Sequence, residues 1–116
     1  MKIISHRGNI NGPSDFENHP NRIKELLDKN IDCEIDIWYI NKTIFLGHDF
    51  GKYEIDLSFL QQKGLWCHAK NLDALDIMLS NNINCFWHQT DDFTLTSNGF
   101  IWTFMNKPLC LSLIHI

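Results

Sequence analysis

Residues 32–40, with the sequence Asp-Cys-Glu-Ile-Asp-Ile-Trp-Tyr-Ile, carry the strongest strand signal in the chain, because β-branched and aromatic residues dominate them. Side chains two apart on a strand point to the same side, so we expect Glu34 and Asp36 to share one face. Two neighbouring carboxylates on one face repel each other, and apolar surroundings increase the free-energy cost of their charges. A divalent cation would relieve this repulsion, and oxygen ligands suit Mg²⁺ or Ca²⁺. The alternative is a pair of exposed acids on a solvated sheet face.

Strands and helices alternate on both sides of this segment. Strands are expected at 2–6, 43–48, 65–69 and 84–89, helices at 20–29 and 72–80, and a hairpin at 93–96 and 100–104 that turns at 97–99. Asn41-Lys42 is expected to form a turn and Asn71 to cap the second helix, while 50–64 is expected to be a loop with a helical turn at 57–62. Repeated strand–helix–strand units favour a parallel sheet covered by helices.

Length and composition limit the class of protein. The chain has 116 residues, which predicts one domain spanning 1–116. A hydrophobic fraction of 44% and a charged fraction of 21% are typical of a globular protein. No apolar run reaches the roughly 18 residues of a membrane span. The net charge is −4 and the basic residues do not cluster, which argues against a nucleic-acid partner.

The cysteines favour a reducing compartment. Cys33, Cys67, Cys85 and Cys110 each lie singly in an apolar run, and no CxxC pair is present, which makes a zinc knuckle improbable. Two disulfides are the alternative. Because free cysteine behaves as a small buried hydrophobe, we favour core thiols in a cytoplasmic protein.

Histidine motifs end two of the expected strands. His6-Arg7-Gly8 closes the first, and His48-Asp49 closes the strand at 43–48. An unperturbed histidine titrates near neutrality, so two of them across a pocket can act as base and acid. The Arg7 guanidinium can bind phosphate in a bidentate fashion. Taken alone, each histidine is more often a hydrogen-bonded structural residue.

Four ordered elements resemble one family. His6-Arg7-Gly8, Glu17-Asn18, Glu34-Ile35-Asp36 and His48-Asp49 are similar to the pattern of the glycerophosphodiester phosphodiesterases, within the phospholipase-C-like phosphodiesterase superfamily. The resemblance covers roughly residues 2–70. It implies an α/β fold, a partial (truncated) TIM-type β/α barrel with mostly parallel strands, whose site lies at the carboxyl ends of the strands.

The resemblance also implies roles for these residues. His6 and His48 would be the catalytic acid–base pair, Glu34 and Asp36 would hold a divalent cation, and Arg7 would bind the substrate phosphate. In the family, an adjacent substrate hydroxyl can attack phosphorus and release the alcohol, with a cyclic phosphate as product or intermediate. The expected partner is therefore a small-molecule phosphodiester.

One position departs from the family pattern. The family supplies a third metal-binding carboxylate in a pattern like E-x-K, and the matching residues here are His68-Ala69-Lys70. Lys70 fits as a substrate-binding residue, but His68 replaces the carboxylate as the metal ligand. Imidazole suits Mn²⁺ or Zn²⁺ better than Mg²⁺ or Ca²⁺. The alternatives are a metal held by two carboxylates with water and substrate, or a decayed site.

The length conflicts with a complete barrel, which needs roughly 200 residues or more. A partial barrel would expose sheet edges and invite self-association. The apolar end at 109–116 suggests an incomplete gene product whose last residues are not native.

Other polar and aromatic residues carry weaker expectations. His88 with Asp91-Asp92 is more consistent with a hydrogen-bonded loop pair than with a part of the site, and Glu17-Asn18 is expected to organise the loop under His6. The tryptophans are expected in the core rather than in a substrate pocket; they are Trp38, Trp66, Trp87 and Trp102.

Three functions remain open from the sequence. The first is metal-dependent hydrolysis of a glycerophosphodiester-type substrate by histidine acid–base catalysis. The second is a non-catalytic phosphate- or phosphodiester-binding module with a degenerate metal site. The third is an α/β domain in which the histidines and acids are structural.

Overall fold

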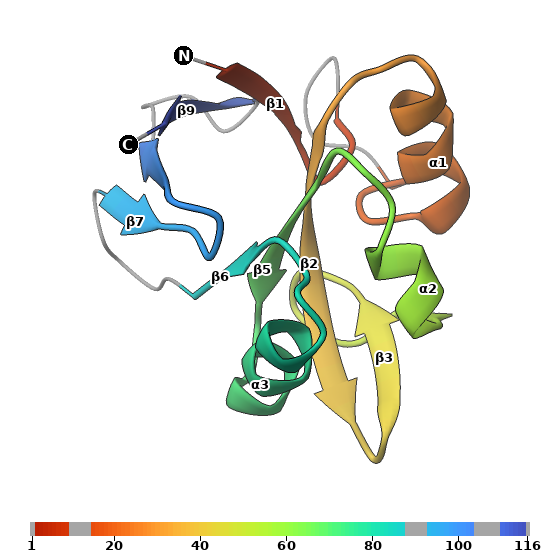
Figure 1. The fold of residues 1–116 in the computed structure, drawn as a ribbon. Helices are drawn as coiled ribbons and strands as arrows, with labels where there is room; N and C mark the ends of the chain where they lie inside the picture. Colours follow the sequence, from red (N-terminus) through yellow and green to blue (C-terminus); the bar gives the residue numbers. More distant parts are fainter. Residues whose placement is uncertain (1, 10–14, 88–92, 104–109, 116) are drawn as a thin grey trace.

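The computed structural model describes residues 2–9, 15–87, 93–103 and 110–115 (Figure 1). The strands are β1 (Lys2–His6), β2 (Cys33–Ile40), β3 (Thr43–Leu46), β4 (Tyr53–Ile55), β5 (Leu65–Ala69), β6 (Cys85–Phe86), β7 (Phe93–Leu95), β8 (Phe100–Thr103) and β9 (Cys110–His115). The helices are α1 (Pro20–Asp28), α2 (Leu57–Leu60) and α3 (Leu72–Ser80). Among the described residues, no helix has the length and apolar character needed to cross a membrane.

Strand β2 is the centre of the sheet because three strands pair with it. β5 runs parallel along one edge, over residues 33–37. On the other edge, β1 pairs in parallel with Cys33 and Glu34, and β3 pairs in antiparallel from Ile37 onward. Asp36 therefore lies beside a gap between the end of β1 and the end of β3.

The prediction of a partial TIM-type barrel with mostly parallel strands is wrong. The strands form a nine-stranded open sheet in the order β4-β3-β2-β1-β9-β8-β7, with β5 on the free edge of β2 and β6 beside β5. Only β1–β2, β2–β5 and β5–β6 are parallel pairs. The other five pairings among the described strands are antiparallel.

Short connections explain this difference. A parallel pair needs a crossover of a dozen or more residues, usually a helix. Asn41 and Lys42 instead join β2 directly to β3, both with positive φ (51° and 62°), as a type I′ hairpin turn requires. Residues 96–99 join β7 to β8 through a different turn, in which the Gly99 amide donates to the Thr96 carbonyl at 3.1 Å and Gly99 has a φ of +82°. The sequence indicates both turns, and each joins two neighbouring strands in antiparallel.

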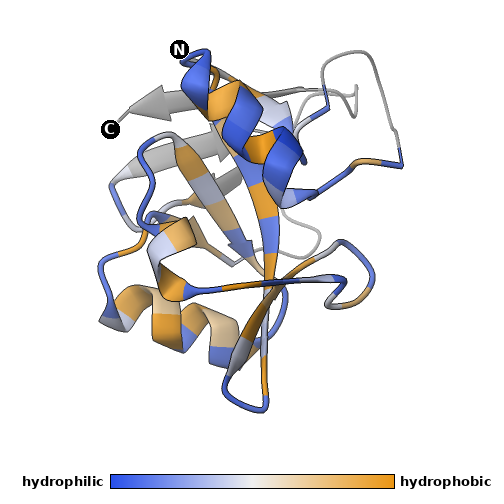
Figure 2. Ribbon diagram, turned by 90° about the vertical axis from the view of Figure 1, so that its right-hand side faces the viewer, coloured by the Kyte–Doolittle hydropathy of each residue, from blue (hydrophilic) through white to orange (hydrophobic). Residues whose placement is uncertain are grey.

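The hydrophobic core lies between the sheet and the helices. Ile35 and Ile37 of β2 are fully buried and pack in one cluster with Ile23 and Leu26 of α1 and Ala74 and Met78 of α3. Figure 2 shows α1 as largely hydrophilic with narrow apolar bands, and α3 as more apolar. Because neighbouring residues of β2 point to opposite faces, the side that buries the isoleucines leaves Glu34 and Asp36 on the other side.

Most of the expected elements are confirmed. The strands at 2–6 and 65–69, the helices near 20–29 and 72–80, and the hairpin around 97–99 are present, and the Asn71 side chain caps α3 by accepting from the Ala74 amide at 3.0 Å. Two strands were not predicted, β4 in the expected loop and β9, which pairs with β1. The strand expected at 84–89 is only the two residues of β6, and 88–89 lie outside the described residues.

The expectation that the cysteines are free core thiols is confirmed for three of them. Cys33, Cys67 and Cys85 are free and buried. Burial raises the pKa of the Cys33 thiol to about 11. These thiols therefore act as apolar core residues.

Candidate functional site

A cluster of ionisable side chains gathers on the face of the sheet opposite the isoleucines. Glu34, Asp36 and His68 offer ligand atoms that all lie within 4.8 Å of one another. The strand register explains the cluster, because Asp36 of β2 is paired with His68 of β5, and His6 of β1 is paired with Glu34. Residues far apart in the sequence thus occupy neighbouring positions on one face.

Asp36 is held in the gap between β1 and β3. Its amide donates to Asn18 Oδ1 at 2.9 Å, and Asn18 Nδ2 donates back to its Oδ2 at 3.0 Å. The Asp36 carbonyl accepts from the Gly47 amide at 3.2 Å. Asn18 therefore replaces a strand partner at this position and fixes the carboxylate.

Arg7 reaches Asp36 through an unusual backbone conformation. Its φ is +56° and that of Gly8 is +78°, so the chain turns sharply at the end of β1. A side chain at Gly8 would meet Ile23 Cδ1 at 2.8 Å from its Cβ. The turn brings Arg7 Nε to 3.2 Å from Asp36 Oδ2 and its NH1 to 3.3 Å from Glu17 Oε2. Left-handed backbone at a non-glycine residue is strained, and such strain is common at functional sites.

His48 approaches from the loop after β3. A Cβ at Gly47 would overlap the carbonyl oxygen of Phe50, and the Gly47 carbonyl accepts from Trp38 Nε1 at 2.8 Å. These contacts fix the loop so that His48 Nδ1 lies 3.5 Å from Asp36 Oδ2. The other ring nitrogen, Nε2, lies 3.3 Å from Arg7 NH2.

His68 lies deepest of the three histidines. Its Nδ1 is 3.1 Å from Asp36 Oδ1 and 3.9 Å from Glu34 Oε2. Its ring stacks on Phe86 of β6, with centroids 5.1 Å apart and an interplanar angle of 5°. The stacking fixes the imidazole against the carboxylates.

Glu34 is buried with fewer polar contacts to its carboxyl group than Asp36 has. Its side chain is 2% exposed, and His6 Nε2 lies 3.4 Å from its Oε1. Among the described residues, Oε1 has no hydrogen-bond partner that meets geometric criteria. An unsatisfied buried carboxylate oxygen is costly, so this atom is a candidate ligand position.

The two carboxyls respond oppositely to the same surroundings. Burial acts to raise the pKa of Asp36, but the neighbouring His48 and His68 rings and the Asn18 carboxamide lower it well below its ordinary value. Burial, together with the charge of Asp36, raises the pKa of Glu34 well above its ordinary value. These shifts favour the negative charge on Asp36 and disfavour a second charge on Glu34.

Direct contacts in the structure join six of the seven site residues that were predicted from the sequence. The seventh, Lys70, follows β5, and its charge acts on Glu34 to lower the pKa of that carboxyl. Glu17 contacts Arg7 and accepts from Asn9 at 2.9 Å. The Asn18 side chain holds Asp36, and the Asn18 amide donates to the Arg7 carbonyl at 3.0 Å, so Asn18 also contacts the loop that follows His6. His88 and Asp91-Asp92 lie outside the described residues.

Phe86 is a site residue that the sequence did not indicate. It was expected only as part of a strand, and nothing in the sequence marks it as the partner of His68.

A cavity of about 200 Å³ opens beside this cluster. It is lined by Glu17, Asn18 and His48 from the cluster and by Asp15, Gly47, Asp49, Phe50 and Lys52 from the flanking loops. His48 is 40% exposed and His6 19% exposed, whereas both carboxylates are buried. A ligand that enters this cavity would therefore meet His48 before the buried carboxylates.

Comparison of the chain with protein-family models, curated proteins and solved structures gives no match.

Proposed function

We propose that the chain binds a divalent cation at Glu34, Asp36 and His68 and hydrolyses a small phosphodiester of the glycerophosphodiester type. The observation that carries the proposal is the convergence of these three ligand atoms within 4.8 Å, with His6, His48 and Arg7 around them. The resemblance of the ordered motifs to the glycerophosphodiester phosphodiesterases supports the same activity.

The donor set is suited to a cation. Two carboxylates and one imidazole are ligands that Mn²⁺ and Zn²⁺ accept readily, and Glu34 Oε1 is buried without a hydrogen-bond partner. A bound cation would supply charge neutralisation of the nonbridging phosphate oxygens.

The protein's own residues divide the remaining work. Arg7 presents guanidinium hydrogens for a phosphate oxygen. Asp36, ionised beside Nδ1 of His48, favours the ring form in which Nε2 carries the lone pair, so His48 is suited to take a proton. His6, on the other side of the cluster, is placed to return a proton to the departing oxygen.

A binding module without turnover is the alternative, and one observation favours it. Asp36 already has Arg7, Asn18, His48 and His68 around it, so this carboxylate is compensated without a cation. Such a protein would hold a phosphodiester through Arg7 but would not cleave it.

We also propose a cytoplasmic location. The free and buried state of Cys33, Cys67 and Cys85 supports it, because structural thiols remain reduced in that compartment.

Isothermal titration of the chelator-treated chain with Mn²⁺, Zn²⁺ and Mg²⁺ tests the cation site. We expect saturable binding of Mn²⁺ or Zn²⁺ that is lost in Glu34→Ala and retained in Glu25→Ala, which removes an exposed glutamate of α1. Absence of divalent binding, or equal binding by both variants, would refute the site.

Hydrolysis of bis(p-nitrophenyl) phosphate and of glycerophosphodiesters with each ion tests the catalytic step. Turnover that disappears in His6→Ala and in His48→Ala supports the enzyme. Phosphodiester binding without turnover would instead support the binding module.

A further inference from the structure

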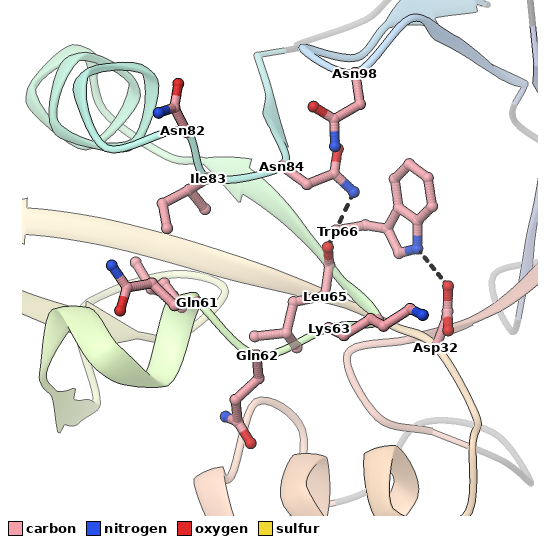
Figure 3. Close-up of a pocket in the computed structure, with 12 residues that line it drawn as sticks. Asp32, Gln61, Gln62, Lys63, Leu65, Trp66, Asn82, Ile83, Asn84 and Asn98 are labelled. Atoms are coloured by element: carbon pink, nitrogen blue, oxygen red, sulfur yellow. Dashed lines mark hydrogen bonds between the residues drawn. The ribbon is translucent and has the colours of Figure 1, made fainter.

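A second cavity lies at the opposite end of the central strands. It has a volume of about 400 Å³ and forms where β5 and β6 begin, between the segment after α2 and the turn after α3. Figure 3 shows side chains from four separate segments around it. Its size falls within the roughly 300–1,000 Å³ typical of small-molecule sites. No residue of the acidic cluster lines it.

Carboxamides dominate the polar lining of this cavity. They are Gln61, Gln62, Asn82, Asn84 and Asn98. Each carboxamide offers both donors and an acceptor. The Asn84 Nδ2 donates to the Leu65 carbonyl at 3.1 Å, while the buried Asn84 Oδ1 has no hydrogen-bond partner among the described residues. One acceptor in the wall is thus buried without a partner, and a ligand hydroxyl that reached it would satisfy it.

The floor of the cavity is apolar. Leu65 is 2% exposed and Ile83 is 4% exposed, and both lie between the amides in Figure 3. These side chains close the base of the cavity, and the donor–acceptor groups stand around it, which matches a compact ring that carries hydroxyls around its edge.

The charges of the lining argue against ionic ligands. Among the described residues that line it, the ionisable side chains are Asp32 and Lys63, and they are of opposite sign. Asp32 already accepts from Trp66 Nε1 at 2.9 Å. The indole of Trp66 is 4% exposed, so it offers no open face on which a nucleobase could stack.

We propose that this cavity binds a neutral polyhydroxylated ring, that is, a monosaccharide or cyclitol. The site is separate from the proposed phosphodiesterase centre and does not depend on it. Recognition would come from hydroxyl–carboxamide hydrogen bonds above Leu65 and Ile83.

Nuclear magnetic resonance of the ¹⁵N-labelled full chain tests the proposal. The probes are glucose, galactose and myo-inositol, each added alone, with sodium sulfate and tetramethylammonium chloride as charged probes. We expect saturable shifts of the Asn84 and Asn98 side-chain amides with at least one neutral probe, at a Kd of about 1 mM or below. Tighter binding of a charged probe, or no saturable shift with any neutral probe, would overturn the proposal.

A variant pair separates specific binding from general effects of the solute. Gln61 and Asn98 are exposed, so the double variant Gln61→Ala/Asn98→Ala should keep the fold, which its backbone spectrum checks. We expect it to weaken the binding of the neutral probe about tenfold or more. Asn21→Ala, an exposed amide on α1, serves as the matched control and should bind as the parent does. Equal affinity of the double variant and the parent would also overturn the proposal.

Discussion

Asp32 directly precedes the central strand β2, Asp36 lies in the middle of that strand, and their surroundings differ. Asp32 is partly exposed and accepts a hydrogen bond from the neutral indole of Trp66. Asp36 is 1% exposed and is surrounded by Arg7 and two histidines. The same residue type, four positions apart, therefore occupies two different environments.

The contrast extends to the two cavities. The end near Asp36 gathers carboxylates, imidazoles and a guanidinium, whereas the end near Asp32 gathers carboxamides around an apolar floor. Burial among charges perturbs the pKa of a carboxyl and makes it useful for cation binding and proton transfer. A neutral lining instead suits recognition by hydrogen bonds. The two ends of the sheet are thus suited to different chemistry, and the following changes should separate them.

The largest effect is expected at the charged end. His48→Ala should lower the rate of bis(p-nitrophenyl) phosphate hydrolysis in Mn²⁺ about 10²–10⁴-fold, because it removes the proposed base. His19→Asn is the matched control: His19 caps α1 outside the cluster, and asparagine preserves a cap. A steady-state rate in His48→Ala equal to that of the control would contradict the proposed role of His48.

Neutralising each of the two carboxyls of the cluster should change the free energy of unfolding in opposite directions. In chelator, Asp36→Asn should lower the free energy of unfolding by about 3 kcal/mol, since it leaves Arg7 and the histidines without their buried counter-charge. Glu34→Gln should leave it unchanged or raise it slightly, because it removes a carboxyl that burial and Asp36 disfavour. Urea denaturation of both variants measures this. Equal destabilisation by the two variants would contradict the difference between the carboxyls.

The pH dependence of stability should follow from the same pair. The pKa of Glu34 is raised by burial and by Asp36, so its stabilising contribution is complete below its ordinary pKa and is lost as pH rises through the higher value. Burial alone would raise the pKa of Asp36, but its hydrogen-bonding neighbours lower the net pKa. The stabilising contribution of Asp36 is therefore present above its ordinary pKa and is lost as pH falls through the lower value.

Thermal unfolding of the metal-free chain across pH tests this dependence. Stability should decline toward alkaline pH, and Glu34→Gln should reduce that decline by about 1 kcal/mol or more. Added Mn²⁺ should restore the most stability at the alkaline end, because binding requires the ionised carboxylate. A decline of the same size in Glu34→Gln would refute this origin.

The smallest effect is expected at the neutral end. Asp32→Asn keeps an oxygen for the Trp66 indole, so we expect a change within about 1 kcal/mol in unfolding free energy. Mn²⁺ affinity should not change, because Asp32 is not part of the cluster. Calorimetric titration beside the parent chain checks this. A clear loss of Mn²⁺ affinity would show that the two ends are coupled.

The sequence alone determined the local structure around the charged cluster. Polar and apolar residues alternate over 32–37, which predicts a strand and the shared face of Glu34 and Asp36. Asn41-Lys42 and Asn71 act at a turn and a helix cap as their chemistry requires. These features depend on contacts between residues close along the chain, so the pattern of residue types is sufficient to predict them.

Only the tertiary structure decided the sheet topology, the partners of each carboxyl and the second cavity. Strand order and register decide three contacts: the pairing of β1 with β9, the position of Asn18 in the gap beside Asp36, and the stacking of Phe86 on His68. The amides around Leu65 come from segments that gain proximity only through the fold. Such contacts join distant residues, and their energy depends on burial and distance, which residue types along a chain do not specify.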